Sequence, residues 1–304
     1  MFIIKHKKIF IAISAVLVVL SIASLFVFGL KIGIDFKGGA LTEVYYAEAR
    51  PDQAMLTEKL DALGYGTLLV QPTGETGYII KSRDLNDAEH ATLLGALSDN
   101  GNLGMREESF NSIGPSVGAT LARKAVVAIV LVSLAIILFI AYAFRKVSRP
   151  VASWKYGVVA IVSLLHDVII PVGFFTYFSH YFGAEVDTLF VVAILTILGL
   201  SVSDTIVIFD RIRENLRNES NVDKADFGAI VGKSLSQSFT RSIATSLTVI
   251  LVLLALVFFG PETTKFFALM LTVGMFFGTY SSIFLASPLL VLVSERQAAS
   301  TNKA

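Results

Sequence analysis

The sequence predicts an α-helical polytopic membrane protein with six transmembrane helices and an α+β domain between the first two helices. The chain has 304 residues, of which 54% are hydrophobic and only 16% are charged. Its mean hydropathy is +0.71, and several uncharged runs reach the roughly 20 residues that cross a bilayer as a helix. Because lipid cannot satisfy backbone polar groups, apolar runs of this length are expected to be helical.

The first span is predicted at residues 9–30, which contain no charge. Lys5, Lys7 and Lys8 precede it. A signal peptide has the same order of parts, but its apolar region is about 7–15 residues and ends at a small-residue cleavage site. We therefore expect an uncleaved first helix with its N-terminus in the cytoplasm.

Residues 31–120 form the one long polar stretch and are predicted to fold as a ferredoxin-like α+β domain. They carry 7 Lys or Arg and 13 Asp or Glu, which argues against a nucleic-acid-binding surface. The chain has no cysteine, so the domain must fold without disulfides. The order β-α-β-β-α-β is typical of this fold. The expected elements are strands at 41–47, 67–71, 78–81 and 104–110, and helices at 52–63 and 85–97.

Five further spans follow, and the charges between them predict the topology. The spans are expected at residues 125–144, 156–178, 189–209, 243–259 and 266–287. Basic residues gather in alternate connections, and basic loops stay in the cytoplasm. The clearest are Arg145, Lys146, Arg149 and Lys155, six Lys or Arg from 211 to 241, and Arg296 and Lys303 in the tail. Both termini are therefore expected inside and the polar domain outside, which divides the chain into residues 1–30, 31–120, 121–294 and 295–304.

Three polar features lie within the predicted spans. Asp204 is about 7–8 Å of helical rise from the cytoplasmic end of the fourth span. His166 and Asp167 lie near the middle of the third span, and Arg241 begins the fifth. Ionisable groups within a membrane are costly and mark functional sites by default. The polar residues expected to support them are Ser201, Ser203, Thr205 and Thr245.

These residue types fit proton transfer. An apolar environment disfavours an ionised carboxyl group, whereas a nearby guanidinium favours it. A movement that made or broke an approach of Arg241 to Asp204 would therefore bind or release a proton. Alternatively, Asp204 forms a static hydrogen bond, Arg241 only follows the charge bias of cytoplasmic loops, and His166 with Asp167 forms a structural network. Asp210, Arg211 and Arg213 fit a membrane-boundary anchor.

Other patterns predict packing and exclude further chemistry. Gly274, Gly278 and Ser282 repeat at every fourth residue, which favours close helix packing, with a channel lining as the alternative. Gly38-Gly39 lacks the spacing of a nucleotide-binding P-loop, so no ATPase is expected. No His, Cys or Glu group has convincing metal-ligand spacing. We expect neither enzyme activity nor a cofactor.

Six segments in order carry a resemblance to the SecF family, the smaller subunit of the SecDF complex of bacterial Sec protein export. The resemblance covers nearly the whole chain, and the segment at 203–215 is its most specific part. The segments are GIDFKGG at 33–39, GPSVG at 114–118, HDV at 166–168, SDTIVIFDRIREN at 203–215, RS at 241–242 with TS at 245–246, and GTYSS at 278–282 with Ala286, Ser287 and Pro288.

The resemblance implies half of a resistance-nodulation-division transporter core that pairs with SecD in the bacterial inner membrane. It implies use of the proton gradient to promote translocation of preproteins through the SecYEG translocon. The family's membrane carboxylate falls on Asp204 and its arginine on Arg241, with His166 and Asp167 at its third-span pair. The expected partners are SecD, SecYEG, the preprotein, protons and membrane lipids, and no nucleic acid. The alternatives are half of a small-solute exporter and a structural subunit that moves no protons.

Overall fold

The computed structural model describes residues 2–66, 68–144, 152–219 and 226–301. The chain divides into two compact units. The first comprises residues 1–31, 128–184 and 189–304, and the second comprises residues 32–127 and 185–188. Arg145, Lys146, Arg149 and Lys303, which contribute to the predicted topology, lie outside the described residues.

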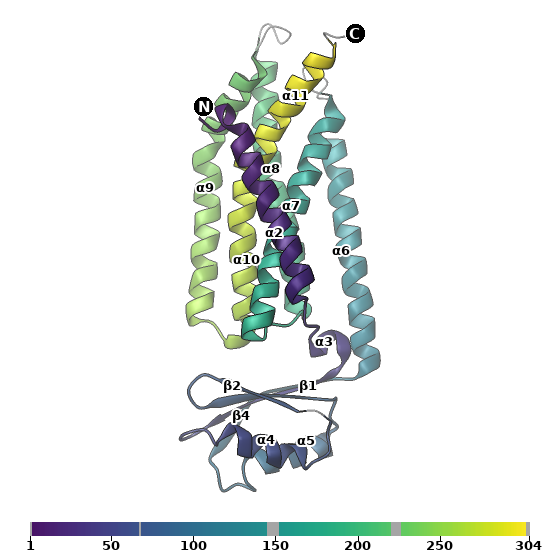
Figure 1. Cartoon of the computed structure of the whole chain (residues 1–304), viewed down its shortest axis with the longest axis vertical. Helices are drawn as coiled ribbons and strands as arrows, with labels where there is room; N and C mark the ends of the chain where they lie inside the picture. The colour runs from purple at the N-terminus through teal and green to yellow at the C-terminus, as the bar shows by residue number, and fades with distance from the viewer. Residues whose placement is uncertain (1, 67, 145–151, 220–225, 302–304) are drawn as a thin grey trace. The chain divides into compact units, whose positions relative to one another are not determined.

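The second unit contains a four-stranded antiparallel sheet and confirms the predicted order of elements (Figure 1). Its strands are β1 (Gly39–Tyr46), β2 (Leu69–Thr73), β3 (Gly77–Ser82) and β4 (Met105–Ile113). The spatial order is β2-β3-β1-β4. The two longer helices are α4 (Gln53–Asp61) and α5 (Asp87–Leu97), and a short helix, α3 (Ile34–Lys37), precedes β1. Pro72 lies in β2, an edge strand, where a missing backbone N–H is tolerated.

The core of this unit lies between the sheet and helices α4 and α5. Alternate residues of β1 point into it, as the period of a strand requires, and Val44 is completely buried. Leu60 of α4 and Leu93 of α5 are also completely buried. The apolar faces of two short helices and one sheet therefore form a single hydrophobic core that needs no disulfide.

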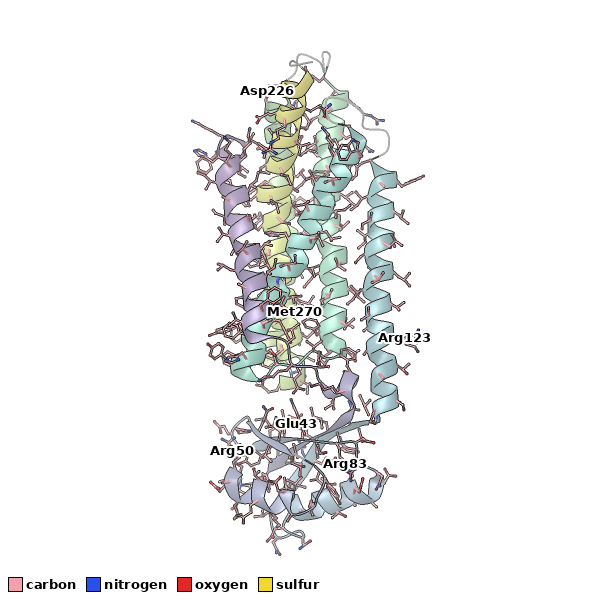
Figure 2. The ribbon with its side chains drawn as sticks, turned by 45° about the vertical axis from the view of Figure 1, so that its right-hand side comes forward. Glu43, Arg50, Arg83, Arg123, Asp226 and Met270 are labelled. Atoms are coloured by element: carbon pink, nitrogen blue, oxygen red, sulfur yellow. The ribbon has the colours of Figure 1, made fainter. Side chains whose placement is uncertain are left out.

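Side-chain caps set the starts of both helices. Asp52 accepts hydrogen bonds from the backbone N–H groups of Ala54 and Met55, so the predicted helix start at Asp52 is its N-cap. Asn86 and Glu89 form a reciprocal capping box at the start of α5. Arg83, labelled in Figure 2, donates to both carboxylate oxygens of Glu89.

The segment 185–188 belongs to the second unit and leads into the fourth long helix. Asp35 Oδ2 accepts from the backbone N–H of Thr188 at 2.9 Å and from its hydroxyl at 2.6 Å. Thr188 is the first residue of that helix, so Asp35 satisfies one of the free N–H groups at its start. Lys81 forms an ion pair with Glu185, with 2.7 Å between Nζ and Oε1.

The helical unit confirms the predicted spans: six helical segments among the described residues are long and apolar enough to cross a membrane. Helix α1 (Phe2–Lys5) is a short N-terminal helix that precedes them. Helix α2 packs against α7, α7 against α10, and α10 against α9. The spans are α2 (Lys7–Phe28), α6 (Pro115–Ala143), α7 (Ser153–Phe182), α8 (Thr188–Arg217), α9 (Phe227–Phe259), and α10 (Glu262–Ser281) continued by a π-helical segment (Ser282–Ala286) and α11 (Ser287–Thr301).

Several helices extend well beyond the apolar runs that predicted them, and two of these carry site residues. Helix α8 continues past Asp204 to Arg217, and α9 begins at Phe227, so Arg241 lies inside a helix and not at its start. Helix α8 continues because Ile208, Ile212 and Leu216 keep a buried apolar face after the opposite face has become charged. Hydropathy therefore predicts the apolar part of each helix, but it does not predict the residues at which the helix begins and ends.

The buried core of the second unit predicts the effect of truncating Leu93. Leu93→Ala should lower the free energy of unfolding of this unit by about 2–5 kcal/mol, because a cavity replaces fully buried methyl groups. Hydrogen–deuterium exchange of the full chain would detect faster exchange in β1 and α5. Met55→Ala, at a residue that is 59% exposed on α4, is the control and should leave exchange nearly unchanged.

The capping box predicts a stability change in acid. The Arg83 hydrogen bond and then the Asn86 backbone N–H lower the pKa of Glu89 from 4.5 to about 2. Its stabilisation should therefore be complete above about pH 4.5 and lost as the pH falls through about 2. In Glu89→Gln, thermal unfolding should lose this part of its pH dependence. Glu58→Gln, on the exposed side of α4, should retain it; equal acid profiles for the wild type and Glu89→Gln would contradict the assignment.

Candidate functional site

Asp204 projects from α8 beside a small cavity in the helical unit. The hydroxyl of Ser242, on α9, donates to Asp204 Oδ1 at 2.5 Å. Asp204 Oδ2 is buried and has no hydrogen-bond partner among the described residues. The carboxylate is therefore held at one oxygen, while the other remains able to bind a proton.

The cavity has a volume of about 110 Å³ and brings residues of three helices together. Asp204 and Arg241 both line it, and Arg241 attracts the Asp204 carboxylate electrostatically without forming a close ion pair. Arg241 itself is exposed on α9. The other lining residues are Leu200, Ser201, Ser203, Val207, Thr245, Ser246, Val249, Gly274, Met275, Gly278 and Thr279.

A second carboxylate, Asp167, is completely buried and is bound by hydroxyl groups from two neighbouring helices. Its Oδ2 accepts from Ser201 of α8 and, at 2.7 Å, from Ser281 of α10. Ser163 donates to Ser281 at 3.0 Å between the hydroxyl oxygens. Asp167 thus connects α7, α8 and α10, because each helix contributes a group to one network.

His166 lies beside this carboxylate and has one ring nitrogen that is not used. Its Nδ1 lies 2.8 Å from Asp167 Oδ1, whereas Nε2 is buried without a partner among the described residues. The Tyr280 ring lies nearly parallel to the imidazole, with 6.2 Å between centroids. Pro171 has no N–H to donate to the Asp167 carbonyl four residues earlier, so this intrahelical bond is missing. The pair is buried in a polar network, and not on a lipid-facing surface.

The small-residue ladder of the last span packs against α8. A Cβ atom at Gly274 would lie 2.4 Å from Ile197, and one at Gly278 would lie 3.3 Å from the Ser201 Cβ. Ser282 continues the ladder, and its hydroxyl lies 2.8 Å from that of Thr205. Residues 274, 278 and 282 therefore meet residues 197, 201 and 205, at the same spacing on both helices. Gly274 and Gly278 also line the cavity, so close packing and a cavity lining occur together.

The predicted supporting residues have different positions. Ser201 and Thr205 are buried, whereas Ser203 and Thr245 are exposed residues that line the cavity. Ser203 forms none of the hydrogen bonds described for Asp204; Ser242 does. The sequence points to Arg241 and Thr245 but does not single out the adjacent face of α9, which carries Ser242. The signal was a serine at every fourth residue, at Ser234, Ser238, Ser242 and Ser246, all of which are buried.

This arrangement can bind and release protons at two carboxylates. Asp204 has a free oxygen and a cation in the same cavity, and Asp167 has an imidazole beside it. Hydroxyl groups, which both donate and accept, surround the two carboxylates. Among the described residues no group of three or more His, Cys, Asp or Glu could hold a metal ion. Carboxylate, imidazole and hydroxyl groups of this kind are all able to accept or donate protons.

Comparison with known proteins gives the chain's relatives. The family description "Protein export membrane protein SecD/SecF, C-terminal" matches residues 95–296. The chain is 41% identical to the protein translocase subunit SecF of Thermobaculum terrenum over 95% of this chain and 92% of that protein. It is 36% identical to the SecDF subunit of Bacillus subtilis, over 92% of this chain but only 36% of that one.

A solved structure has the same fold. The crystal structure of SecDF from Thermus thermophilus, described as a translocon-associated membrane protein, superposes with a TM-score of 0.80 at 29% identity. The match covers 96% of this chain and 38% of that one. The relatives and the solved structure match nearly the whole chain, and the family description matches residues 95–296. The chain therefore belongs to the SecD/SecF family of protein-export membrane proteins.

Proposed function

We propose that this chain uses the proton gradient to promote translocation and release of preproteins through the Sec channel. The observation that carries the proposal is the cavity in which Asp204 has an unbonded, buried carboxylate oxygen near Arg241. A carboxyl group in such a place gains or loses its charge when its exposure to water or to the guanidinium changes. A proton arriving at Asp204 would thus favour a different packing of α8 and α9.

His166 and Asp167 complete the proposed proton path. Asp167 is the more deeply buried carboxylate, and its three hydrogen bonds suit it to hold a proton or a charge away from water. Intramembrane chains of Asp and His are typical of proton relays. In this proposal Asp204 binds and releases the proton, Arg241 controls its affinity, and His166 with Asp167 supports the path.

A SecD-like partner and a defined orientation belong to the same proposal. The SecDF relatives carry on one chain both a part similar to this protein and a longer remainder, which supports association with a separate SecD. Basic residues such as Lys7, Lys8 and Arg217 support cytoplasmic termini and an outer-face position for residues 31–120. SecYEG and the emerging preprotein would be the further partners, and lipids would cover the apolar faces of helices such as α2.

Asp204→Asn tests the proposal because it removes the titrating group and nearly preserves shape. Export driven by the proton gradient, measured in inner-membrane vesicles, should fall by about a hundredfold, which is typical of losing a positioned proton-transfer group. Asp210→Asn, an exposed carboxylate on the same helix, is the matched control and should keep most of the activity. If Asp204→Asn exports at the full rate, Asp204 does not drive export, and the result favours the alternative of a structural subunit that moves no protons.

Arg241 should act through its charge in the cavity. Arg241→Gln should slow gradient-dependent export about tenfold or more, whereas Arg241→Lys should retain part of the rate because it keeps the charge but loses the planar fork. The same vesicle assay at several pH values measures both variants. Arg213→Gln, whose side chain is paired with Asp210 outside the cavity, is the control. Equal rates for Arg241→Gln and the wild type would exclude electrostatic control by Arg241.

A further inference from the structure

Ser201 is in contact with both parts of the polar site. Its hydroxyl donates to Asp167 Oδ2, and the same residue lines the cavity that contains Asp204. Asp204 lies three residues further along α8, a spacing that places two side chains on neighbouring positions of one helix face. Of the two hydroxyl groups that bind Asp167 Oδ2, those of Ser201 and Ser281, only that of Ser201 belongs to a residue lining this cavity.

The properties of a hydroxyl group suit this position. It has one proton to donate and two lone pairs to accept, so it can receive a proton as it gives its own away. A cavity of about 110 Å³ has room for several water molecules. Water can therefore bridge from Asp204 to the side of Ser201 that faces the cavity.

We propose that Ser201 is the hydroxyl relay that passes a proton between the Asp204 cavity and the buried Asp167–His166 pair. This inference rests on the proposed proton-driven function. In the step, a protonated Asp204 gives its proton to Ser201 Oγ, either directly or through a cavity water that receives the Asp204 proton as it passes on its own, while Ser201 gives its hydroxyl proton to Asp167 Oδ2. One O–H bond forms and one breaks at Ser201, so the net result is a proton moved to Asp167. Once Asp167 has released this proton, rotation of the Ser201 hydroxyl restores its original hydrogen bond to Asp167 Oδ2.

The groups around Ser201 give the relay two ends. At one end Asp204 of α8 interacts electrostatically with Arg241 of α9 and with Asp167 of α7. At the other end His166 of α7 adjoins Asp167 and is covered by the Tyr280 ring of α10. A proton on Asp167 would reduce the repulsion between the two carboxylates, so the two sites are coupled by charge as well as through Ser201.

Ser281 provides the matched comparison. It donates to the same oxygen, Asp167 Oδ2, and is completely buried, but it does not line the cavity. If Ser201 only anchors Asp167, then removing either hydroxyl should have the same effect. If Ser201 relays protons, then removing its hydroxyl should have the larger effect on proton-dependent rates.

The experiment compares Ser201→Ala, Ser281→Ala and Asp204→Asn in inner-membrane vesicles, with export rates measured against pH and in D₂O. We expect Ser201→Ala to slow the gradient-dependent rate about tenfold or more and to change the pH profile and solvent isotope effect. Ser281→Ala, which removes a hydrogen bond to the same oxygen but leaves the route from the cavity, should slow the rate less than Ser201→Ala and keep the wild-type solvent isotope effect. Protein levels in the membrane are measured for every variant. If Ser201→Ala does not accumulate, Ser201→Cys replaces it with the same expectation, because a thiol is a weak donor of similar size.

The outcomes separate the relay from the function on which it rests. Equal losses in Ser201→Ala and Ser281→Ala, or a full rate in Ser201→Ala, would overturn the relay. In either case, a loss of gradient-dependent export in Asp204→Asn would still support proton-driven export. A full rate in Asp204→Asn would instead reject the proposed function itself.

Discussion

The hydrogen bonds that hold Asp167 are the interaction on which the helical unit depends. A completely buried carboxylate is costly unless its oxygens are bonded, and here the donors come from α8 and α10, with His166 alongside. The network can form only if the three helices meet at one depth. Gly274 and Gly278 allow that approach because they place no side chain between α10 and α8. The close packing at Gly274 and Gly278 and the hydrogen bonds from Ser201 and Ser281 to Asp167 therefore depend on each other.

The π-helical segment Ser282–Ala286 follows from the same requirement. It begins directly after Ser281, which donates to Asp167, and Ser282 lies 2.8 Å from the Thr205 hydroxyl. Two consecutive serines thus contact two different helices. A wider turn changes the direction of the residues that follow it, and such turns often occur at functional sites. The Ser287 hydroxyl donates to the Ser282 carbonyl at 3.0 Å, which satisfies a backbone group at the altered turn.

Much of the fold could be predicted from the sequence because its signals are local. Uncharged runs predict the spans, and alternation with turn residues predicts the α+β domain. The site was only partly predictable. Asp204 and Asp167 could be recognised because a carboxylate in an apolar run is costly wherever it points. Ser242 could not be assigned in the same way, since a serine donates to its own helix or to a neighbour depending on the packing, and only the structure shows that it binds Asp204.

Asp35, which lies before β1 in the sequence, stabilises the start of helix α8. Its carboxylate binds the first N–H group of α8 and the Thr188 hydroxyl, and Lys81 pairs with Glu185 in the adjoining segment. A negative group at a helix start is favoured by the helix dipole as well as by these hydrogen bonds. The start of α8 is thereby fixed within the α+β unit, while Ser201 and Asp204 lie further along the same helix. Asp35 therefore stabilises the first residue of α8 both by hydrogen bonds and by charge.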